Sequence, residues 1–206
     1  MELILVRHGI TPGNLERRFV GRLDQPLAPE GEALAREVAP TLPPVEHIYR
    51  SPLLRCRQTA DILWPGVEQT VVDNLKETDF GPYEGKCHAE LDGDPVYQRW
   101  LNGELEIGEP IENCNARAEQ ALRDIAADVA AKGYERAGIV AHGGIFMSML
   151  ARFGLPERSY YDWLLPNCSG YRAQLETCLL YTSFRSGRKP YTFTSVSPSM
   201  ASLSRG

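Results

Sequence analysis

Two short apolar runs, each ending in a histidine that a glycine follows, constrain the fold of this chain most. They lie in LILVRHG, residues 3–9, and in AGIVAHGG, residues 137–144, and they carry His8 and His142 at their ends. Continuous apolar runs of this length are typical of strands that are buried on both faces of a parallel sheet. In open α/β folds, ligands bind at the carboxyl ends of such strands. The sequence therefore predicts that both imidazoles lie at one edge of a parallel sheet.

Segments with strand and helix patterns alternate along the chain. Two further strands are expected at 45–51 and 69–75, and two antiparallel edge strands at 170–177 and 179–184. Periodic apolar residues with proline starts and with proline or glycine stops predict helices; these are 29–42, 51–64, 114–133 and 144–154. The alternation predicts the α/β class, as a three-layer α/β/α sandwich with a mostly parallel sheet and an antiparallel edge.

The remaining segments complete the predicted domain. Ser51 is expected to cap the helix that follows it, with proline at the first helical position. Glycine, proline and acidic residues interrupt the pattern at about 79–114, which predicts a small cap-like excursion with one short helix near 96–101. We expect a single domain over residues 1–185. Residues 186–206, rich in serine, proline and arginine, are expected to be a tail without regular structure.

Composition narrows the class of protein. A chain of 206 residues with 43% hydrophobic residues can bury one sizeable core. A net charge of −5 gives no basic field for nucleic acid or for an anionic membrane. Neither a spanning apolar run nor a signal peptide is recognised, so a cytoplasmic protein is expected, as a monomer or homodimer. Five scattered cysteines without a C-x-x-C pair predict reduced packing residues.

The residues around the two histidines point to anion chemistry. Arg7 provides a planar fork that suits phosphate oxygens. The helix expected after His142 presents its first N–H groups, near Gly143, to an anion. Arg55 lies early in another helix that follows a strand. A single Arg-His pair is more often a surface ion-pair participant, but two strand–His–Gly units together favour phosphoryl transfer to a histidine. The histidine at 47 is expected to be structural, and the one at 88 to face a pocket or solvent.

Five segments, in order, match a known family. They are LVRHGITPGN, RRFVGRLDQPLAPEGEALA, IYRSPLLRCRQTA, LKETDFGPYEG and IVAHGGIF. Together they cover about residues 3–155, and the chain resembles the histidine phosphatase superfamily, with its phosphoglycerate-mutase-like fold. The resemblance is most specific in this order of motifs, because each motif alone is weak.

The resemblance implies a role for each matching residue. His8 looks like the nucleophile that becomes phosphohistidine. Arg7, Arg55 and His142 look like the groups that hold the phosphoryl oxygens. Glu77 looks like the general acid for the leaving oxygen and then the base for water. The alternative for Glu77 is a solvated loop acid.

Further positions follow from the same resemblance. Asn14, Thr11, Gly21 and Gly143 match phosphate-binding or substrate-binding positions. Arg57 falls outside the pattern and is expected at the surface. No metal and no other cofactor is implied, because cationic side chains take the place of a metal. The expected partner is a small-molecule phosphate ester.

Hydrolysis is favoured over mutase chemistry. Glu77 and His142 are 65 positions apart, which looks short beside the long insert of cofactor-dependent mutases. The nearest branch is that of α-ribazole and broad-specificity phosphatases. Tyr83 and Ile10 replace the family's usual tryptophan and acid, which leaves the substrate open. The basic residues of the first loop meet a second anionic group or are solvated; these are Arg17, Arg18 and Arg22.

Three alternatives remain. One is phosphoglycerate mutase-type transfer. Another is a non-catalytic protein that binds a phosphorylated ligand. The third is a magnesium-dependent haloacid-dehalogenase-like phosphatase, because DGDPV at 92–96 fits D-x-D-x-V. That motif must end a buried strand, and the preceding residues CHAELD do not form a plausible one.

Overall fold

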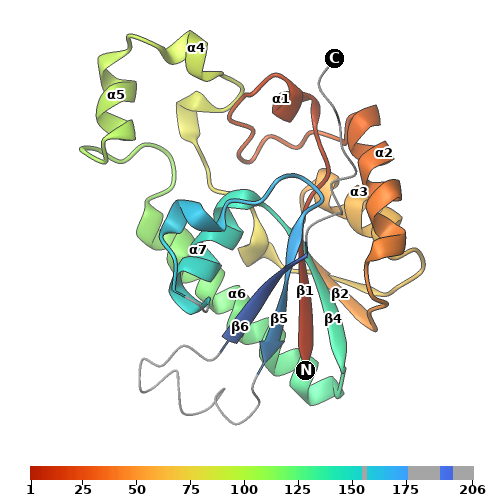
Figure 1. Cartoon of the computed structure of the whole chain (residues 1–206). Helices are drawn as coiled ribbons and strands as arrows, with labels where there is room; N and C mark the ends of the chain where they lie inside the picture. The colour runs from red at the N-terminus through yellow and green to blue at the C-terminus, as the bar shows by residue number, and fades with distance from the viewer. Residues whose placement is uncertain (155–156, 176–190, 197–206) are drawn as a thin grey trace.

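In the computed structural model, residues 1–154, 157–175 and 191–196 are described, and they form one mixed sheet flanked by helices (Figure 1). The strand order is β3-β2-β4-β1-β5-β6. The strand bounds are β1 Glu2–Arg7, β2 His47–Arg50, β3 Gln69–Val71, β4 Arg136–Ala141, β5 Gly170–Leu175 and β6 Tyr191–Val196. β1 to β4 are parallel, whereas β5 runs antiparallel to β1 and β6 antiparallel to β5. The predicted mostly parallel sheet with an antiparallel edge is confirmed.

Helices cover both faces of this sheet, as a three-layer sandwich requires. α2 Pro29–Val38 and α3 Leu54–Leu63 pack on one face, and α6 Ile111–Lys132 and α7 Gly143–Phe153 on the other. Side chains of β1 alternate between the two cores: Leu3 and Leu5 belong to the α6–α7 side, and Ile4 and Val6 to the α2–α3 side. This alternation explains the continuous apolar run, because both faces of β1 are buried.

The parallel pairing of β1 with β4 places the two histidines together. The register runs from Glu2 opposite Arg136 to Arg7 opposite Ala141. His8 then follows β1, and its backbone N–H donates to the Ala141 carbonyl at 3.0 Å. His142 follows β4 directly. The two imidazoles therefore leave the same edge of the sheet, as their strand patterns predict.

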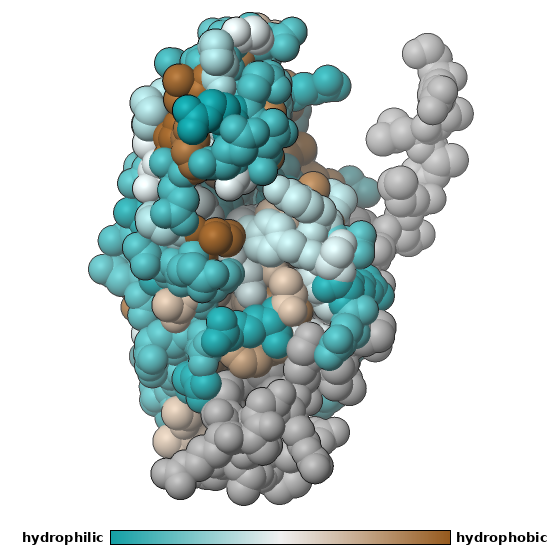
Figure 2. Space-filling model, turned by 90° about the vertical axis from the view of Figure 1, so that its left-hand side faces the viewer, coloured by the Kyte–Doolittle hydropathy of each residue, from teal (hydrophilic) through white to brown (hydrophobic). Residues whose placement is uncertain are grey.

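The excursion is a small lobe beyond this edge of the sheet (Figure 1). It carries α4 His88–Leu91 and α5 Pro95–Leu101, of which only α5 is predicted. Tyr83, Leu91 and Tyr97 form its buried centre, packed against Phe19 of the first loop and a few half-buried neighbours. Apolar surface is visible among polar side chains on the upper lobe in Figure 2. The lobe thus has a cluster of its own and rests on the loop that follows His8.

Other short elements complete the described fold. α1 Pro12–Leu15 interrupts the first loop. Single 3-10 turns are η1 Ala39–Thr41, η2 Asp73–Leu75, η3 Gly81–Tyr83 and η4 Tyr160–Trp163. Within the described ranges, no helix has the length and apolar character needed to cross a bilayer.

Two boundary predictions are wrong. α3 begins at Leu54, and its N-cap residue is Leu53, without a side-chain cap. The Ser51 hydroxyl lies 2.7 Å from His142 Nε2 and accepts from the Leu53 N–H at 3.4 Å, one residue before the helix begins. β6 lies inside the tail that was expected to lack regular structure. Its alternating aromatic and β-branched residues have high strand propensity, and the open edge of β5 supplies its backbone partners. The predicted strand at 179–184 lies outside the described residues.

Candidate active site

His8 has the hydrogen bonding of a nucleophilic imidazole. Its side chain is buried, and Nδ1 lies 2.7 Å from the Gly9 carbonyl oxygen. A carbonyl only accepts, so Nδ1 carries the proton. The Arg55 Nε–H group donates to His8 Nε2 at 3.3 Å, which makes Nε2 the unprotonated nitrogen. A lone pair on Nε2 therefore faces the guanidinium of Arg55.

The surroundings of His8 keep it neutral. Burial, followed by the positive charges of Arg55 and Arg7, holds the pKa of His8 well below its ordinary value of 6.5. The same factors, with burial again the largest, hold the pKa of His142 well below 6.5. The two rings meet edge to face with their centroids 5.1 Å apart. Two neutral imidazoles thus lie between two cations.

Arg7 and Arg55 are held by backbone carbonyls and make no ion pair within the described part of the chain. Arg55 is fully buried and donates to the carbonyls of Gly21 at 2.7 Å and Leu23 at 2.8 Å. Arg7 Nη1 donates to the Leu165 carbonyl, while its buried Nε has no partner among the described atoms. Arginine stays charged in proteins. The site therefore has two positive charges that an anion could neutralise.

His142 is positioned from the neighbouring strand and helix. Its Nε2 lies 2.7 Å from the Ser51 hydroxyl, which follows β2, and 3.5 Å from the Cys56 thiol of α3. Burial raises the pKa of Cys56 to about 12, so this thiol is neutral. Ser51 and Cys56 orient the imidazole without adding charge.

Glu77 lies at the N-terminus of α7. Its Oε2 accepts from the Gly144 N–H at 3.2 Å, and its Oε1 accepts from the Thr78 N–H at 2.9 Å. A Cβ on Gly144 would come within 2.5 Å of Glu77 Oε1, so a glycine is needed for this approach. Gly143, the first residue of α7, packs against the Arg7 guanidinium. The acid and the helix N–H groups thus share one side of the site.

The first loop is fixed by a capping box and by a residue that sequence reasoning missed. Thr11 Oγ1 accepts from the Asn14 N–H at 3.3 Å, and Asn14 Oδ1 accepts from the Thr11 N–H at 3.1 Å. Asn167 donates from Nδ2 to Asn14 Oδ1 at 3.2 Å and to the His8 carbonyl at 3.0 Å. With its oxygen occupied, Asn14 keeps its NH₂ group as a donor.

The remaining predicted residues have varied positions. Gly21 has a φ of 52°, the left-handed region that favours glycine, and it contacts Arg55 through its carbonyl. Arg18 pairs with Glu16 and Glu90 at 2.6 Å and 2.8 Å, which ties the first loop to the excursion. Arg17 and Arg57 are exposed.

Two other histidines lie outside this constellation. His47 is buried on β2, where Nε2 lies 2.8 Å from Thr70 Oγ1 and the ring stacks on Tyr134. His88 packs against Phe19 and Tyr97 in the excursion. Neither contacts His8.

The motif DGDPV does not end a strand. It follows α4 and runs into α5, where Asp94 Oδ1 accepts from the Val96 N–H at 2.8 Å and so caps the helix. The haloacid-dehalogenase-like alternative therefore lacks its structural context. Within the described ranges, no group of three or more histidine, cysteine or acidic side chains could hold a metal ion.

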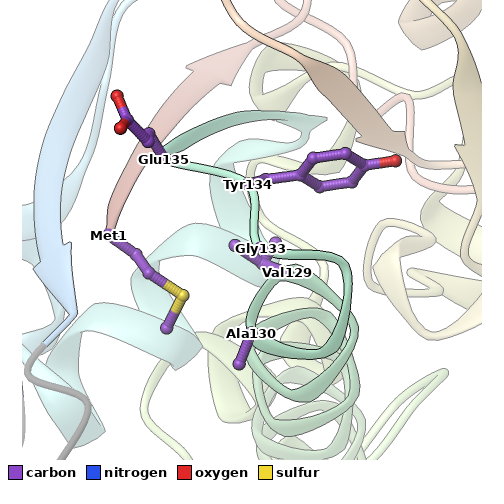
Figure 3. Close-up of a pocket in the computed structure, with 6 residues that line it drawn as sticks. All are labelled: Met1, Val129, Ala130, Gly133, Tyr134 and Glu135. Atoms are coloured by element: carbon purple, nitrogen blue, oxygen red, sulfur yellow. The ribbon is translucent and has the colours of Figure 1, made fainter.

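A pocket lies at the end of β1 opposite the His8 site. It is lined by Met1, Val129, Ala130, Gly133, Tyr134 and Glu135. In Figure 3 the Glu135 carboxylate and the Tyr134 hydroxyl point away from the hollow between Met1 and Ala130. It brings no set of reactive groups together, unlike the His8 site.

The comparison with family models decides the family. Residues 3–179 match the model of the histidine phosphatase superfamily (branch 1). The chain belongs to this superfamily. As a histidine phosphatase superfamily member, it is an enzyme of the phosphatase class, and its relatives are named phosphatases or phosphoglycerate mutases.

Three relatives illustrate the range of names within the histidine phosphatases. "Putative phosphoserine phosphatase 2" of Hydrogenobacter thermophilus is 36% identical over 153 residues, which are 69% of this chain and 73% of the relative. "Probable phosphoglycerate mutase GpmB" of Enterobacter sp. is 34% identical over 184 residues, 82% of each chain. The crystal structure of the α-ribazole phosphatase from Shigella flexneri has a TM-score of 0.74 over 86% of this chain and 92% of that chain. At 23% identity, this likeness shows a shared fold.

Proposed function

We propose that the protein is a metal-independent phosphatase that hydrolyses a small phosphate monoester through a phosphohistidine on His8. The observation that carries the proposal is the unprotonated Nε2 of His8 beside two guanidiniums that form no ion pair within the described chain and are held by backbone carbonyls. Such a pocket attracts a phosphate dianion and leaves the nucleophile neutral. Arg7, Arg55 and His142 would contact the phosphoryl oxygens.

The reaction follows in two balanced steps. In the first, the Nε2 lone pair of His8 forms a bond to phosphorus while the bond to the ester oxygen breaks. Glu77 gives a proton to the departing oxygen, which leaves as an alcohol. In the second, water attacks phosphorus, Glu77 takes a proton from that water, and the P–N bond breaks. The products are the alcohol and inorganic phosphate, and His8 regains its lone pair.

The test is hydrolysis of p-nitrophenyl phosphate in EDTA by the wild type and by His8→Ala. We expect His8→Ala to lose at least about 10³-fold in kcat, because the nucleophile is removed. His47→Ala is the matched control: it removes another buried histidine, one that lies outside the site, and should retain kcat. Full activity of His8→Ala in EDTA would refute the proposal.

The identity of the substrate is proposed from the family resemblance and from the names of relatives. α-Ribazole 5′-phosphate and phosphoserine are the first two candidates, and a panel of phosphate monoesters compared by kcat/KM would rank them. Conversion of 3-phosphoglycerate without release of phosphate would instead favour mutase transfer, the activity for which the Enterobacter relative is named. Phosphate binding without turnover of any ester would favour a non-catalytic binding protein.

A further inference from the structure

A carboxylate outside the proposed phosphate site, that of Glu109, joins two arginines. Its side chain is 8% exposed and accepts two hydrogen bonds from Arg117, at 2.6 Å from Nε and 2.7 Å from Nη2. It also lies 3.3 Å from Nη2 of Arg22. Glu109 comes from the end of the excursion, Arg117 from α6 and Arg22 from the first loop. One acid thus ties three distant segments together.

Both arginines then hold the backbone of the segment that carries Glu77. Arg117 Nη1 donates to the carbonyls of Asn74 at 2.8 Å and Lys76 at 2.9 Å. Arg22 Nε donates to the carbonyl of Glu77 itself at 3.3 Å. Three carbonyls at and before the proposed acid are therefore fixed by side chains that Glu109 holds in place.

The same segment is also fixed just after Glu77. The Glu109 N–H donates to the Asp79 carbonyl at 2.8 Å. Gly108, at a φ of 73°, lets the two backbones approach, because a Cβ there would overlap the Asp79 carbonyl. Arg22 Nη1 lies 3.5 Å from Asp79 Oδ2. Residues 74–79 are thus held from both sides by one network.

The opposite charges of Glu109 and the two arginines stabilise this network. Burial alone would raise the pKa of Glu109, but the hydrogen bonds and charge of Arg117, with the charge of Arg22, lower it below the ordinary value. Removing the carboxylate would take from Arg117 its ion-pair partner and leave Arg22 with Asp79 alone. Arg22 also follows Gly21, whose carbonyl accepts from Arg55, so the network continues into the phosphate pocket.

We propose that Glu109, Arg22 and Arg117 form a clamp that positions the Glu77 carboxyl for proton transfer to the leaving oxygen. The inference rests on the proposed function, in which Glu77 is the general acid. The three are positioning residues, because they act through the 74–79 backbone. Their contribution to the rate is expected to be larger for more basic leaving groups, which depend more on protonation by Glu77.

The test compares Glu109→Gln with Glu2→Gln across leaving groups of different acidity. Glu2 is the matched control: its side chain is also 8% exposed and is held by two arginines, Arg136 and Arg172, at the far end of β1. We expect Glu109→Gln to lose about 10²-fold in kcat/KM for phenyl phosphate, because kcat/KM reports the step in which the leaving oxygen is protonated and a misplaced catalytic group can cost this much. For p-nitrophenyl phosphate, whose leaving group needs little protonation, the loss should stay below about threefold. Glu2→Gln should leave the ratio of the two rates unchanged.

A second variant keeps the inference open to refutation if Glu109→Gln does not fold. Arg22→Gln removes a side chain that is 38% exposed, and it should shift the same ratio in the same direction. Equal losses for both substrates in these variants would overturn the clamp. Glu77→Gln separates the two proposals. Equal losses for phenyl phosphate and p-nitrophenyl phosphate in that variant would overturn the role of Glu77 as the acid, and the clamp with it. If Glu77→Gln loses more activity on phenyl phosphate than on p-nitrophenyl phosphate, but Glu109→Gln loses the same on both, only the clamp is overturned.

Discussion

The two ends of β1 differ in how their charged side chains are paired. At its start, the buried carboxylate of Glu2 is paired with Arg136 and, at 2.6 Å, with Arg172. At its end, Arg7 and the neighbouring Arg55 are held by carbonyls and form no ion pair within the described residues. The first end is an ion-pair network, and the second holds two cations that form no ion pair in the described part of the chain.

The difference separates an end of β1 that satisfies its own charges from the end at which we propose that phosphate binds. A closed network satisfies its own charges and has no need of a ligand. Burial, and after it the positive charge of the guanidiniums, lowers the pKa values of His8 and His142. Placing a phosphate dianion there would supply the missing charge. The strand therefore starts at a structural ion-pair network and ends at the candidate active site.

The largest expected effect comes from removing a cation at the end of β1 that carries Arg7 (the open end); the end with Glu2 is the closed end. Arg55→Gln should lower kcat/KM about 10²–10³-fold, because a donor to the transition-state charge is lost. Arg136→Gln removes a cation at the closed end and should change kcat/KM less than about twofold. Steady-state rates with one phosphate ester measure both. Similar losses in the two variants would mean that Arg55 acts only through stability.

A smaller effect concerns pH. His8 and His142 have pKa values below 6.5 in the folded protein, so the unfolded chain binds more protons as the pH falls below 6.5. Stability should be fully present above that pH and decline below it by about 1.4 kcal/mol per pH unit for each histidine. Urea unfolding at several pH values measures this slope, which should be shallower in His8→Ala. An unchanged slope in that variant would contradict the buried neutral imidazole.

The closed end should respond in a different pH range. The pKa of Glu2 is lowered from 4.5, because its arginine partners outweigh the effect of burial, which alone would raise it. Its stabilisation is present above 4.5 and is lost as the pH falls through the lower folded value. Glu2→Gln should therefore cost about 1–3 kcal/mol of unfolding free energy at pH 7, and less below pH 4. A change in kcat in this variant would show that the two ends are coupled.

The sequence predicted the rim of the site well because strand geometry determines it. Once two apolar runs are parallel neighbours, His8 and His142 must emerge at one edge. The role of Ser51 was less accessible, because Ser-Pro before a helix favours a cap, while its contact to His142 depends on the β2–β4 pairing. Asn167 had no signal, since it reaches Asn14 only through the fold.

The segments that escaped prediction share a dependence on distant partners. α4 is a single turn, too short for a periodic pattern, and it is fixed by contacts with the first loop such as the bridge of Arg18 to Cys87. β6 needs the edge of β5. The motif KETDFG identified Glu77, but nothing near it indicated that Glu109, some thirty positions later, holds its backbone in place.

The most direct measurement is to trap the phosphoenzyme. The protein would be mixed with a ³²P-labelled phosphate ester, quenched in alkali, and digested for peptide mapping by mass spectrometry. The account predicts a label on the peptide that contains His8, stable in alkali, released by acid and absent from His8→Ala. Label on another residue, or steady turnover with no labelled enzyme under any quench, would contradict the central claim that His8 carries the phosphoryl group.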